Sequence, residues 1–425
     1  MHRARVRGGE GALKLPVPDS HPVPAEIERL RSALSRFLEE EVGPAEDAAR
    51  IADEADASAA LEGWVRARSA ALGLYRVLQP ADLGGGGVGA LGMVALHEAV
   101  GRSGCVLGHL ALGGDGGLLR FSSGAQRERF LGPVLRGEAT AALAFTDARE
   151  GPRTTARGRG ETFLVSGVKA FVTGGARADL LLTVAKVTEH PRGVTGTALF
   201  VIPRRTSGVT LRREIRTLDG AVHGEFALDQ VEVPAADMIG DIGQGLPRAL
   251  ESIAILRLRA AALACGAAGW ALAHALDGAR RPHRTGAPLG EREQVQAMLG
   301  ESATELYAAR AAVYATAARA EACEDIETEA AMAKATATEM AARVVDRAIQ
   351  LSGAAAVVED HPLARLYRRI RPWRIAEGTT EILRLTVARR LLAPEGEPDT
   401  SRARAAAANT SLERPTGGPT GHASE

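Results

Sequence analysis

The sequence predicts an α+β protein of three successive units: an N-terminal helical domain, a middle antiparallel β domain and a C-terminal helical bundle. The chain has 425 residues, which is too long for one ordinary hydrophobic core. Helical periodicity gives way near residue 140 to short β-prone runs, and it returns near residue 245. Because helices and strands are segregated along the chain, we expect separately packed units.

The N-terminal helical domain is expected over residues 25–139. Apolar residues recur at the spacing of one helix face in three segments: around Leu30, Leu34, Phe37 and Leu38, over residues 91–106, and over residues 126–135. A segment with Pro80 followed by the glycines of residues 84–87 interrupts this pattern and predicts a loop.

The β domain is expected over residues 140–238, where Gly, Pro and charged residues separate short β-prone runs. This spacing is typical of antiparallel strands joined by turns. The expected strands are Ala141–Thr146, Phe163–Val165, Ala170–Thr173, Leu180–Val187, Ala198–Ile202, Gly208–Leu211 and Glu225–Val233.

The C-terminal bundle is expected over residues 239–393. Four long helices fit the periodicity, at residues 246–280, 291–320, 327–353 and 380–392, with a short helix near 362–367. The most apolar stretch, residues 260–276, contains His274 and is shorter than the roughly 20 residues that span a membrane. We therefore expect it to be a buried helix.

Composition excludes several classes of protein. Lys plus Arg equals Asp plus Glu at 52 each, so no net basic charge favours nucleic acid or a membrane surface. Cys105, Cys265 and Cys323 lie far apart, which argues against a disulfide framework or a cysteine-based metal site and favours a cytoplasmic protein. The N-terminus is basic, but no long apolar segment follows, so it does not resemble a secretory signal.

Both ends of the chain differ from the units between them. Residues 1–24 and 394–425 are rich in Gly, Pro and polar residues and show no periodicity. Such composition predicts disordered tails.

The sharpest chemical signal is the segment IAEGTTEILR at residues 375–384. A loop ends at Gly378, and a helix begins at Thr379 or Thr380. A hydroxyl at a helix start is ordinarily a cap, and a Glu before it is ordinarily a surface residue. The free N–H groups of the same helix start could instead bind a cofactor phosphate, hydroxyl or carbonyl, with Glu377 beside it.

This segment resembles the signature of the acyl-CoA dehydrogenases, in which Tyr-Glu-Gly-Thr-Ser precedes Ile-x-Arg-Leu, and residues 387–390 are similar to the family's ending. Further family motifs are matched in the same order along residues 25–393. They are the Thr-Glu-Pro strand and loop at Ala144–Gly151, the Asn-Gly-x-Lys hairpin at Val165–Gly174, the Val-Pro strand at Phe226–Pro234 and the Gln turn at Gln350–Gly353.

The resemblance implies a helical domain, a β-barrel-like domain and a four-helix bundle, with FAD at their junction. Phe145 and Phe171 would lie against the flavin ring, and Thr146 and Thr173 would hydrogen-bond it. A ring that is apolar on its faces and polar at its edges suits such strands. Without the resemblance, these residues would be the core and the polar face of a hairpin.

Further cofactor contacts are implied for Arg281, Thr379 and Glu381. Gln350 and Gly353 would approach the FAD of a neighbouring subunit, which implies a homo-oligomer, a tetramer as in the family. A Gln late in a helix is otherwise merely exposed.

The resemblance implies oxidation of an acyl thioester, bound to CoA or to an acyl carrier protein, with electrons passing to an electron-transfer protein. Glu377 would remove the proton next to the thioester carbonyl, while Gly378 and Arg257 would lie close to the substrate. Some family members carry the base at the position of Leu256, which cannot accept a proton here. The alternative for Arg257 is a salt bridge on the helix surface.

Several positions depart from the family pattern. Pro152 and Arg153 replace Ser and Asp, Phe171 replaces Trp, and Ala354 replaces a second Gly. The Arg-x-x-Phe-Gly clamp is blurred over residues 280–286, where Arg281 is only a neighbouring substitute, and residues 368–369 are Arg-Arg rather than Arg-Asp. The change at Pro152 and Arg153 falls where the resemblance places the pantetheine arm and the FAD pyrophosphate, so it predicts either a different thioester handle or weaker flavin binding. Two alternatives stay open: a flavin oxidase or monooxygenase, and a helical scaffold without flavin.

Overall fold

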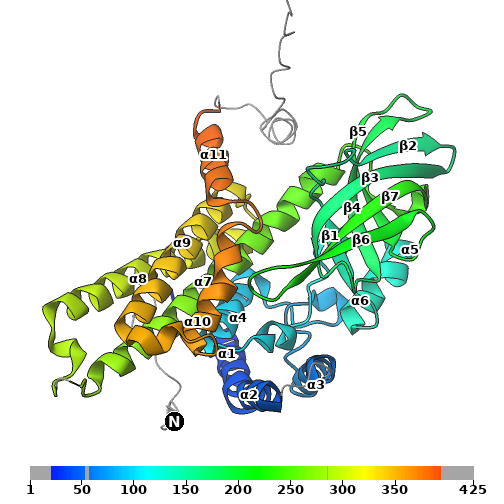
Figure 1. The fold of residues 1–425 in the computed structure, drawn as a ribbon. Coiled ribbons are helices and arrows are strands. Elements are labelled where there is room, and N and C mark those ends of the chain that lie inside the picture. Colours follow the sequence, from blue (N-terminus) through cyan, green and yellow to red (C-terminus); the bar gives the residue numbers. More distant parts are fainter. Residues whose placement is uncertain (1–20, 53–56, 285, 394–425) are drawn as a thin grey trace, which may run out of the picture.

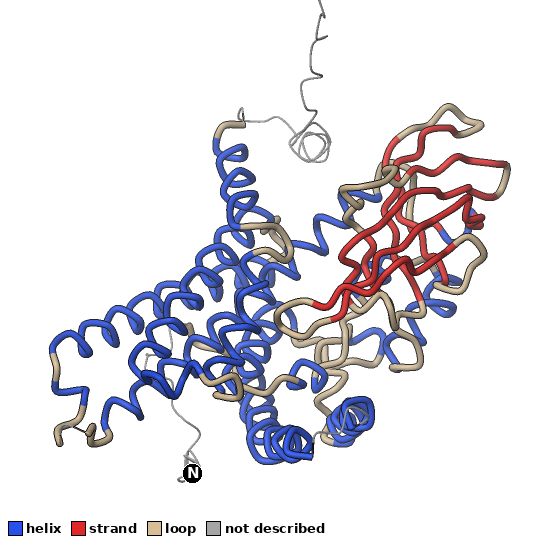
Figure 2. The backbone as a smooth tube through the Cα atoms, viewed as in Figure 1, coloured by secondary structure: helices blue, strands red, loops and turns tan. Residues whose placement is uncertain are grey.

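The computed structural model describes residues 21–52, 57–284 and 286–393, so almost all of both predicted tails lies outside the described residues. A helical domain, a sheet and a group of long helices follow one another along the chain, which confirms the three-part fold (Figure 1). The sheet lies on one side of the molecule and the long C-terminal helices on the other. The separation of helix from strand is nearly complete (Figure 2).

The N-terminal domain is built from short helices. Helix α1 (Ala25–Phe37) continues through a π-helical turn (Leu38–Val42) into α2 (Gly43–Ala52). The other α-helices are α3 (Ala57–Ala71), α4 (Gly89–Ser103), α5 (Gly124–Gln126) and α6 (Gly132–Arg136). A second π-helical turn, Arg127–Leu131, joins α5 to α6. Short 3-10 helices occupy Ala81–Leu83, Leu107–Ala111 and Gly117–Phe121. The expected apolar face of α1 is buried, with Leu34 and Leu38 fully inaccessible.

The predicted helix over residues 91–106 is found at Gly89–Ser103. It ends because Gly104 takes the left-handed conformation, with φ of 73°, that glycine adopts at low cost.

The sheet contains eight strands in the order β6-β7-β3-β2-β4-β5-β8, with β1 paired to β4. Their bounds are β1 (Ala141–Ala144), β2 (Thr155–Arg159), β3 (Thr162–Thr173), β4 (Leu180–Glu189), β5 (Gly196–Pro203), β6 (Val209–Arg216), β7 (Val222–Pro234) and β8 (Met238–Ile239). Most pairs are antiparallel as expected, but β1 and β2 each run parallel to β4.

Three strand predictions need correction. The run expected to reach Thr146 leaves the sheet ladder after Ala144. The two runs expected at residues 163–165 and 170–173 are one strand, β3, because Gly167 allows a bulge where any side chain would meet Thr154. Strand β2 was not predicted, because its sequence TARGR has little β-prone character and is held by its neighbours on both sides.

The C-terminal helices were predicted within three residues at each end. They are α7 (Gly245–Arg280), α8 (Glu293–Glu321), α9 (Glu327–Ser352), α10 (Pro362–Ile370) and α11 (Thr380–Leu391). Short 3-10 helices lie at Ala235–Asp237, Leu289–Glu291, Gly353–Val357 and Arg371–Arg374. The core between α7, α8 and α9 is made largely of alanine, so the helices can pack closely. The start of α7 reaches the sheet, where the Leu246 N–H donates to Thr197 Oγ1 at 2.9 Å.

Helix α7 is the one helix among the described residues that is long and apolar enough to cross a membrane. Most of its apolar stretch is buried inside the protein, as predicted for residues 260–276.

Helices α4 and α7 come into backbone contact at two glycines. A Cβ on Gly101 would lie 2.3 Å from the Leu263 carbonyl oxygen, and one on Gly266 would lie 2.1 Å from that of Glu98. The two glycines therefore fix the N-terminal domain against the C-terminal helices at backbone contact. This crossing also brings His97 of α4 and Arg259 of α7 into electrostatic range of each other.

Candidate active site

The loop of residues 375–379 carries the candidate base in a strained conformation. Glu377 has a φ of +55°, and Gly378 follows with +102°. Among the non-glycine residues that the structure describes, only Phe171, Gln230, Cys323 and Glu377 have positive φ. Such conformations persist only where their surroundings fix them, and they concentrate at functional sites.

Two buried cations hold the carbonyl groups of this loop. Arg257 on α7 donates from Nε to the Glu377 carbonyl at 3.0 Å, and Lys334 on α9 donates from Nζ to the Gly378 carbonyl at 2.7 Å. Arg257 is only 6% exposed, and Lys334 is fully buried. Since donors on two different helices fix successive peptide groups, the backbone of the candidate base has little freedom.

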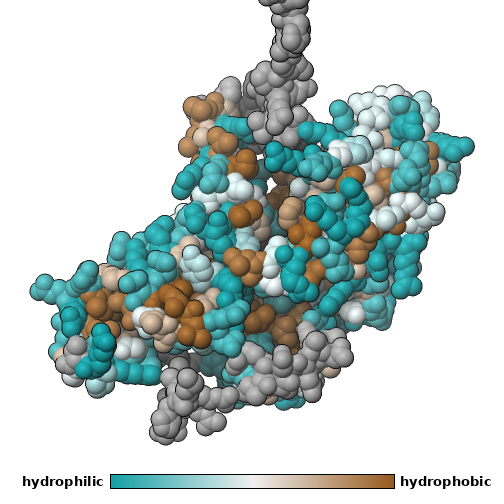
Figure 3. Space-filling model, viewed as in Figure 1, coloured by the Kyte–Doolittle hydropathy of each residue, from teal (hydrophilic) through white to brown (hydrophobic). Residues whose placement is uncertain are grey.

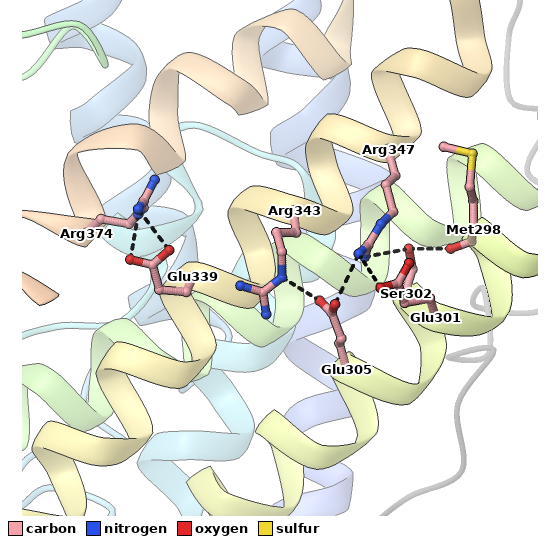
Figure 4. A network of polar contacts seen from close by, with 8 residues as sticks. All are labelled: Met298, Glu301, Ser302, Glu305, Glu339, Arg343, Arg347 and Arg374. Carbon is pink, nitrogen blue, oxygen red and sulfur yellow. Dashed lines mark hydrogen bonds and ion pairs between the residues drawn. The ribbon is translucent and has the colours of Figure 1, made fainter. Parts of the chain in front are cut away.

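One carboxylate fixes both ends of the same loop. Glu339 on α9 accepts a hydrogen bond from Nε of Arg374, just before the loop, at 2.9 Å, and it forms an ion pair with Nη2 of the same residue at 2.8 Å (Figure 4). It also accepts from the Thr380 hydroxyl, just after the loop, at 2.9 Å. The neighbouring ion pairs of Arg343 and Arg347 with Glu305 join α9 to α8 and do not involve the loop (Figure 4).

Burial raises the pKa of the half-buried Glu377 carboxyl above its ordinary value, and the charges of Arg257, Lys334 and Arg259 partly oppose this shift. Burial, followed by the charge of Arg257, lowers the pKa of Lys334 to about 8. A carboxylate whose pKa is raised by desolvation is a stronger base than one in water.

The helix start behaves as the cap predicted from its hydroxyl. Thr379 precedes α11, and its Oγ1 accepts a hydrogen bond from the Ile382 N–H at 3.4 Å. Glu381 is exposed in the first turn, where hydrogen bonds from its own backbone N–H and from Thr379 lower its pKa. Contact of Thr379 and Glu381 with a cofactor stays a prediction.

A second group of predicted residues gathers along β3. The chain after β1 runs beside β3, where the Ala170 N–H donates to the Thr146 carbonyl at 2.9 Å. Lys169, only 2% exposed, donates to the Phe145 carbonyl at 2.9 Å and pairs with Asp147 at 2.8 Å. A buried cation thus fixes the segment that carries Phe145 and Thr146.

Phe171 stands out from the sheet because β3 is irregular there. The register between β3 and β7 shifts between Lys169 and Val172, Phe171 has a φ of +52°, and its side chain is 58% exposed. Thr173 lies two residues on and shares a hydrogen bond of 3.2 Å with His223 Nδ1, and the His223 ring also contacts the edge of Phe171. An exposed aromatic ring beside exposed hydroxyls suits the flat face and polar edges of a flavin. These residues therefore fit an FAD ring.

The other predicted cofactor residues lie far from this region. Gln350 is exposed sixteen residues beyond Lys334 on α9, which is about 24 Å along a helix. Gly353 ends the same helix with a φ of +68°. Arg281, paired with Asp277, follows the end of α7, about 36 Å along the helix from Arg257. One chain does not bring these three residues to Glu377.

Reasoning from the sequence missed three residues of the site. Lys334 could have been found, because it interrupts an apolar helix face of Ala330, Ala337 and Ala341 at helical spacing. Glu339 and His223 gave no such signal: Glu339 resembles any charged residue on a helix, and His223 reaches Thr173 only through strand register.

Comparison with known proteins identifies the family of the chain. Models of the N-terminal, middle and C-terminal domains of acyl-CoA dehydrogenase match residues 24–138, 141–231 and 243–392. The chain is similar to the 3-(aryl)acrylate reductase of Clostridium sporogenes, with 29% identity over 86% of this chain and 98% of the relative. It is also similar to the acyl-CoA dehydrogenase of Bacillus subtilis, with 31% identity over 75% of this chain and 87% of the relative.

A similar solved structure is that of a probable acyl-CoA dehydrogenase from Mycobacterium abscessus. It has a TM-score of 0.77 and 27% identity over 87% of this chain and 99% of that one. Sequence, domain order and fold thus agree. The chain belongs to the acyl-CoA dehydrogenase family of flavin-dependent oxidoreductases.

Proposed function

We propose that this protein is an FAD-dependent enzyme that interconverts a saturated acyl thioester and its α,β-unsaturated form, with Glu377 as the group that moves the α-proton. The observation that carries the proposal is the base loop, in which Arg257, Lys334 and Glu339 fix a strained backbone around a carboxyl of raised pKa. A plain surface glutamate before a helix cap would need none of these contacts.

The peptide geometry indicates where the thioester carbonyl binds. In a trans peptide the C=O and the following N–H point in opposite directions. Because the Glu377 carbonyl turns toward Arg257, the Gly378 N–H turns away from it. We expect backbone N–H groups of this loop to hold the carbonyl oxygen, where negative charge develops as the proton leaves.

The remaining roles follow from the chemistry. FAD, when bound, supplies the hydride acceptor at the β-carbon. Glu377 accepts the α-proton in the oxidation and returns it in the reduction, and Phe171 orients the flavin ring and excludes water from one side. The relative from Clostridium sporogenes is named a reductase, so both directions need testing.

The experiment is an anaerobic titration of the purified, FAD-loaded protein with a panel of acyl-CoA thioesters and their 2-enoyl counterparts. We expect saturated thioesters to bleach the flavin absorbance and enoyl thioesters to reoxidise the reduced protein. A flavin that no thioester reduces, and that no enoyl thioester oxidises, would exclude this function. Consumption of oxygen during turnover, without another electron acceptor, would identify a flavin oxidase instead of an enzyme that serves an electron-transfer protein.

We propose that the thioester handle is unusual, with an acyl carrier protein at least as suitable as CoA. Arg149 and Arg153 are exposed beside Pro152, in the loop expected to meet the handle. Both handles carry phosphopantetheine, so the arginines suit either. We expect a carrier-bound acyl group to react at least as well as acyl-CoA of equal chain length. A strong preference for CoA in matched kinetics would refute the carrier.

We propose a homo-oligomer, because the distant residues need a second chain to reach a cofactor. Apolar side chains lie exposed on the projecting helix α11, including Ile382, Leu385 and Leu391 (Figure 3). A hollow of about 460 Å³ lies between this helix and α9. Sedimentation should therefore find a symmetric oligomer, a tetramer as the family resemblance implies. A monomer that binds FAD tightly would contradict this.

A further inference from the structure

Arg259 on α7 lies close to the base with part of its guanidinium unsatisfied. Its Nε is buried and finds no hydrogen-bond partner among the residues that the structure describes. Its one ion pair joins Nη2 to Asp115 Oδ2 at 3.5 Å, which is long for a charge-assisted hydrogen bond. The side chain is only 23% exposed, so bulk water cannot fully compensate.

The position of Arg259 separates it from the cations that hold the base loop. It follows Arg257 by two residues, which places the two side chains on nearly opposite sides of the helix. Arg259 turns toward Asp115 in the N-terminal domain and is near enough to α4 to act on His97. Its charge nevertheless also acts on the carboxyl of Glu377. Arg259 therefore lies where the base and the N-terminal domain meet.

The surroundings of Arg259 are rigid, and the charged group paired with it is the carboxylate of Asp115. Burial, with the charge of Arg259, lowers the pKa of His97 to about 3, so this ring is neutral at physiological pH. Asp115 is fixed because its Oδ1 accepts from the Gly117 N–H at 3.0 Å. Its loop is packed so closely that a Cβ on Gly113 would lie 2.5 Å from the Tyr75 carbonyl.

We propose that Arg259 binds an oxygen-bearing substituent, above all a carboxylate, on the acyl chain of the substrate. The inference rests on the proposed function, which places an acyl thioester against Glu377. The handle is expected beside residues 149–153 of the β domain, so the other end of the acyl group extends toward the N-terminal domain.

The chemistry of arginine supports this substrate class. A buried donor without an acceptor is rare in native proteins and calls for a partner, which can be a water molecule, an ion or a bound ligand. The planar guanidinium matches a carboxylate better than any other side chain does. A plain hydrocarbon chain would remove water from Arg259 without supplying an acceptor, so it should bind less well.

The alternative is that Arg259 has only a structural role, in which its ion pair with Asp115 joins α7 to the loop of residues 113–117. The two roles predict different behaviour for two variants. If Arg259 has only the structural role, Arg259→Met and Asp115→Asn break the same ion pair and change stability and binding alike. If it binds substrate, only Arg259→Met removes the recognising group, while Asp115→Asn leaves the guanidinium in place.

The test is calorimetric binding to FAD-loaded protein in a Glu377→Gln background, which isolates binding from turnover. The ligands are glutaryl-CoA and valeryl-CoA, which have equal carbon number, with 5-hydroxyvaleryl-CoA and 5-aminovaleryl-CoA as further arms. We expect glutaryl-CoA to bind about 10-fold or more tightly than valeryl-CoA, the hydroxy compound to lie between them, and the amine to gain nothing. Arg259→Met should remove this preference, and Asp115→Asn should keep or increase it.

Equal binding of glutaryl- and valeryl-CoA, a preference for the amine, or a preference that survives Arg259→Met would overturn the inference. A preference found in a protein whose flavin no thioester reduces would leave this inference standing and remove the proposed function. Absence of binding by all four CoA thioesters would also overturn the inference.

Discussion

The base loop and the distant cofactor residues are held in different ways. Glu377 sits in a strained loop whose carbonyls and ends are fixed by buried or half-buried side chains of α7 and α9. Gln350 is exposed, and Arg281, just after the end of α7, pairs with Asp277 in the last turn of that helix. One chain thus holds the proposed proton-transfer group in place, whereas the proposed far side of the cofactor site would need a second copy. Changes in the first region should alter rate, and changes in the second should alter cofactor retention.

The largest effect is expected from Glu377→Gln. Gln keeps the size and the hydrogen-bonding capacity of the side chain but cannot accept a proton, so FAD and oligomer should be retained. Flavin reduction by thioester should fall by about 10²–10⁴-fold, the usual contribution of a positioned base. Stopped-flow absorbance measures this rate. Leu256→Glu in the same background should restore part of it, and a double variant as slow as Glu377→Gln would refute this rescue.

Removing the Lys334 ammonium should change the position of the Glu377 carboxyl without altering that side chain, because Lys334 binds the backbone of the loop. Lys334→Met leaves the Gly378 carbonyl without its buried donor, and an unsatisfied buried acceptor costs about 1–3 kcal/mol. We expect a lower free energy of unfolding in urea and flavin reduction slowed by about 10-fold, since a misplaced base loses efficiency.

Thr338→Val is the matched control for Lys334. The Thr338 hydroxyl is buried on the same helix and donates to the Lys334 carbonyl, away from the loop. It should lower stability with little change in rate. Equal loss of rate in both variants would mean that α9 supports the fold and does not position the base.

Gln350→Ala tests the second region. Because Gln350 is exposed and far from Glu377, the change should leave the free energy of unfolding of the separated chain unchanged. In the oligomer, loss of one hydrogen bond should lower the affinity for FAD by about 10-fold or less. Equilibrium dialysis measures the affinity. Unchanged FAD binding in the intact oligomer would remove Gln350 from the cofactor site.

The smallest effect is expected from Glu339→Gln, paired with Glu305→Gln as a control. Both carboxylates accept from arginines on the same side of the bundle (Figure 4), but only Glu339 also holds Arg374 and Thr380 around the base loop. Both pairs are partly exposed, so each change should cost about 1 kcal/mol or less. Only Glu339→Gln should slow flavin reduction, by a few fold. An equal slowing in Glu305→Gln would refute the specific role.

The helices were predicted closely because their signals are local. Long runs of Ala and Leu at helical spacing fixed α7, α8 and α9 within three residues, and the hydroxyl at Thr379 marked the start of α11. Strand β2 was missed because its residues have little intrinsic preference for β structure, and its position depends on pairing with β3 and β4.

The parts of the candidate site that the sequence predicted are those that lie in stretches resembling the family's motifs. Glu377, Gly378 and Thr379 stand together in one segment, whereas Lys334 and Glu339 reach it from another helix. Contacts between segments distant in the chain leave little trace in a single sequence. The role of Arg259 could not be predicted from the sequence for the same reason, because its ion-pair partner Asp115 lies more than one hundred residues away in the chain.

The central claim is that Glu377 moves the α-proton, and proton exchange tests it apart from hydride transfer. The probe is a 3-thia-acyl-CoA, in which sulfur replaces the β-carbon and no hydride can leave. In deuterated water, the FAD-loaded protein should incorporate deuterium at the α-carbon, measured by mass spectrometry. The rate should rise with pH through the raised pKa of Glu377 and then level off, since only the ionised carboxylate is a base. Glu377→Gln should lose this exchange, and exchange at the parental rate in that variant would contradict the account.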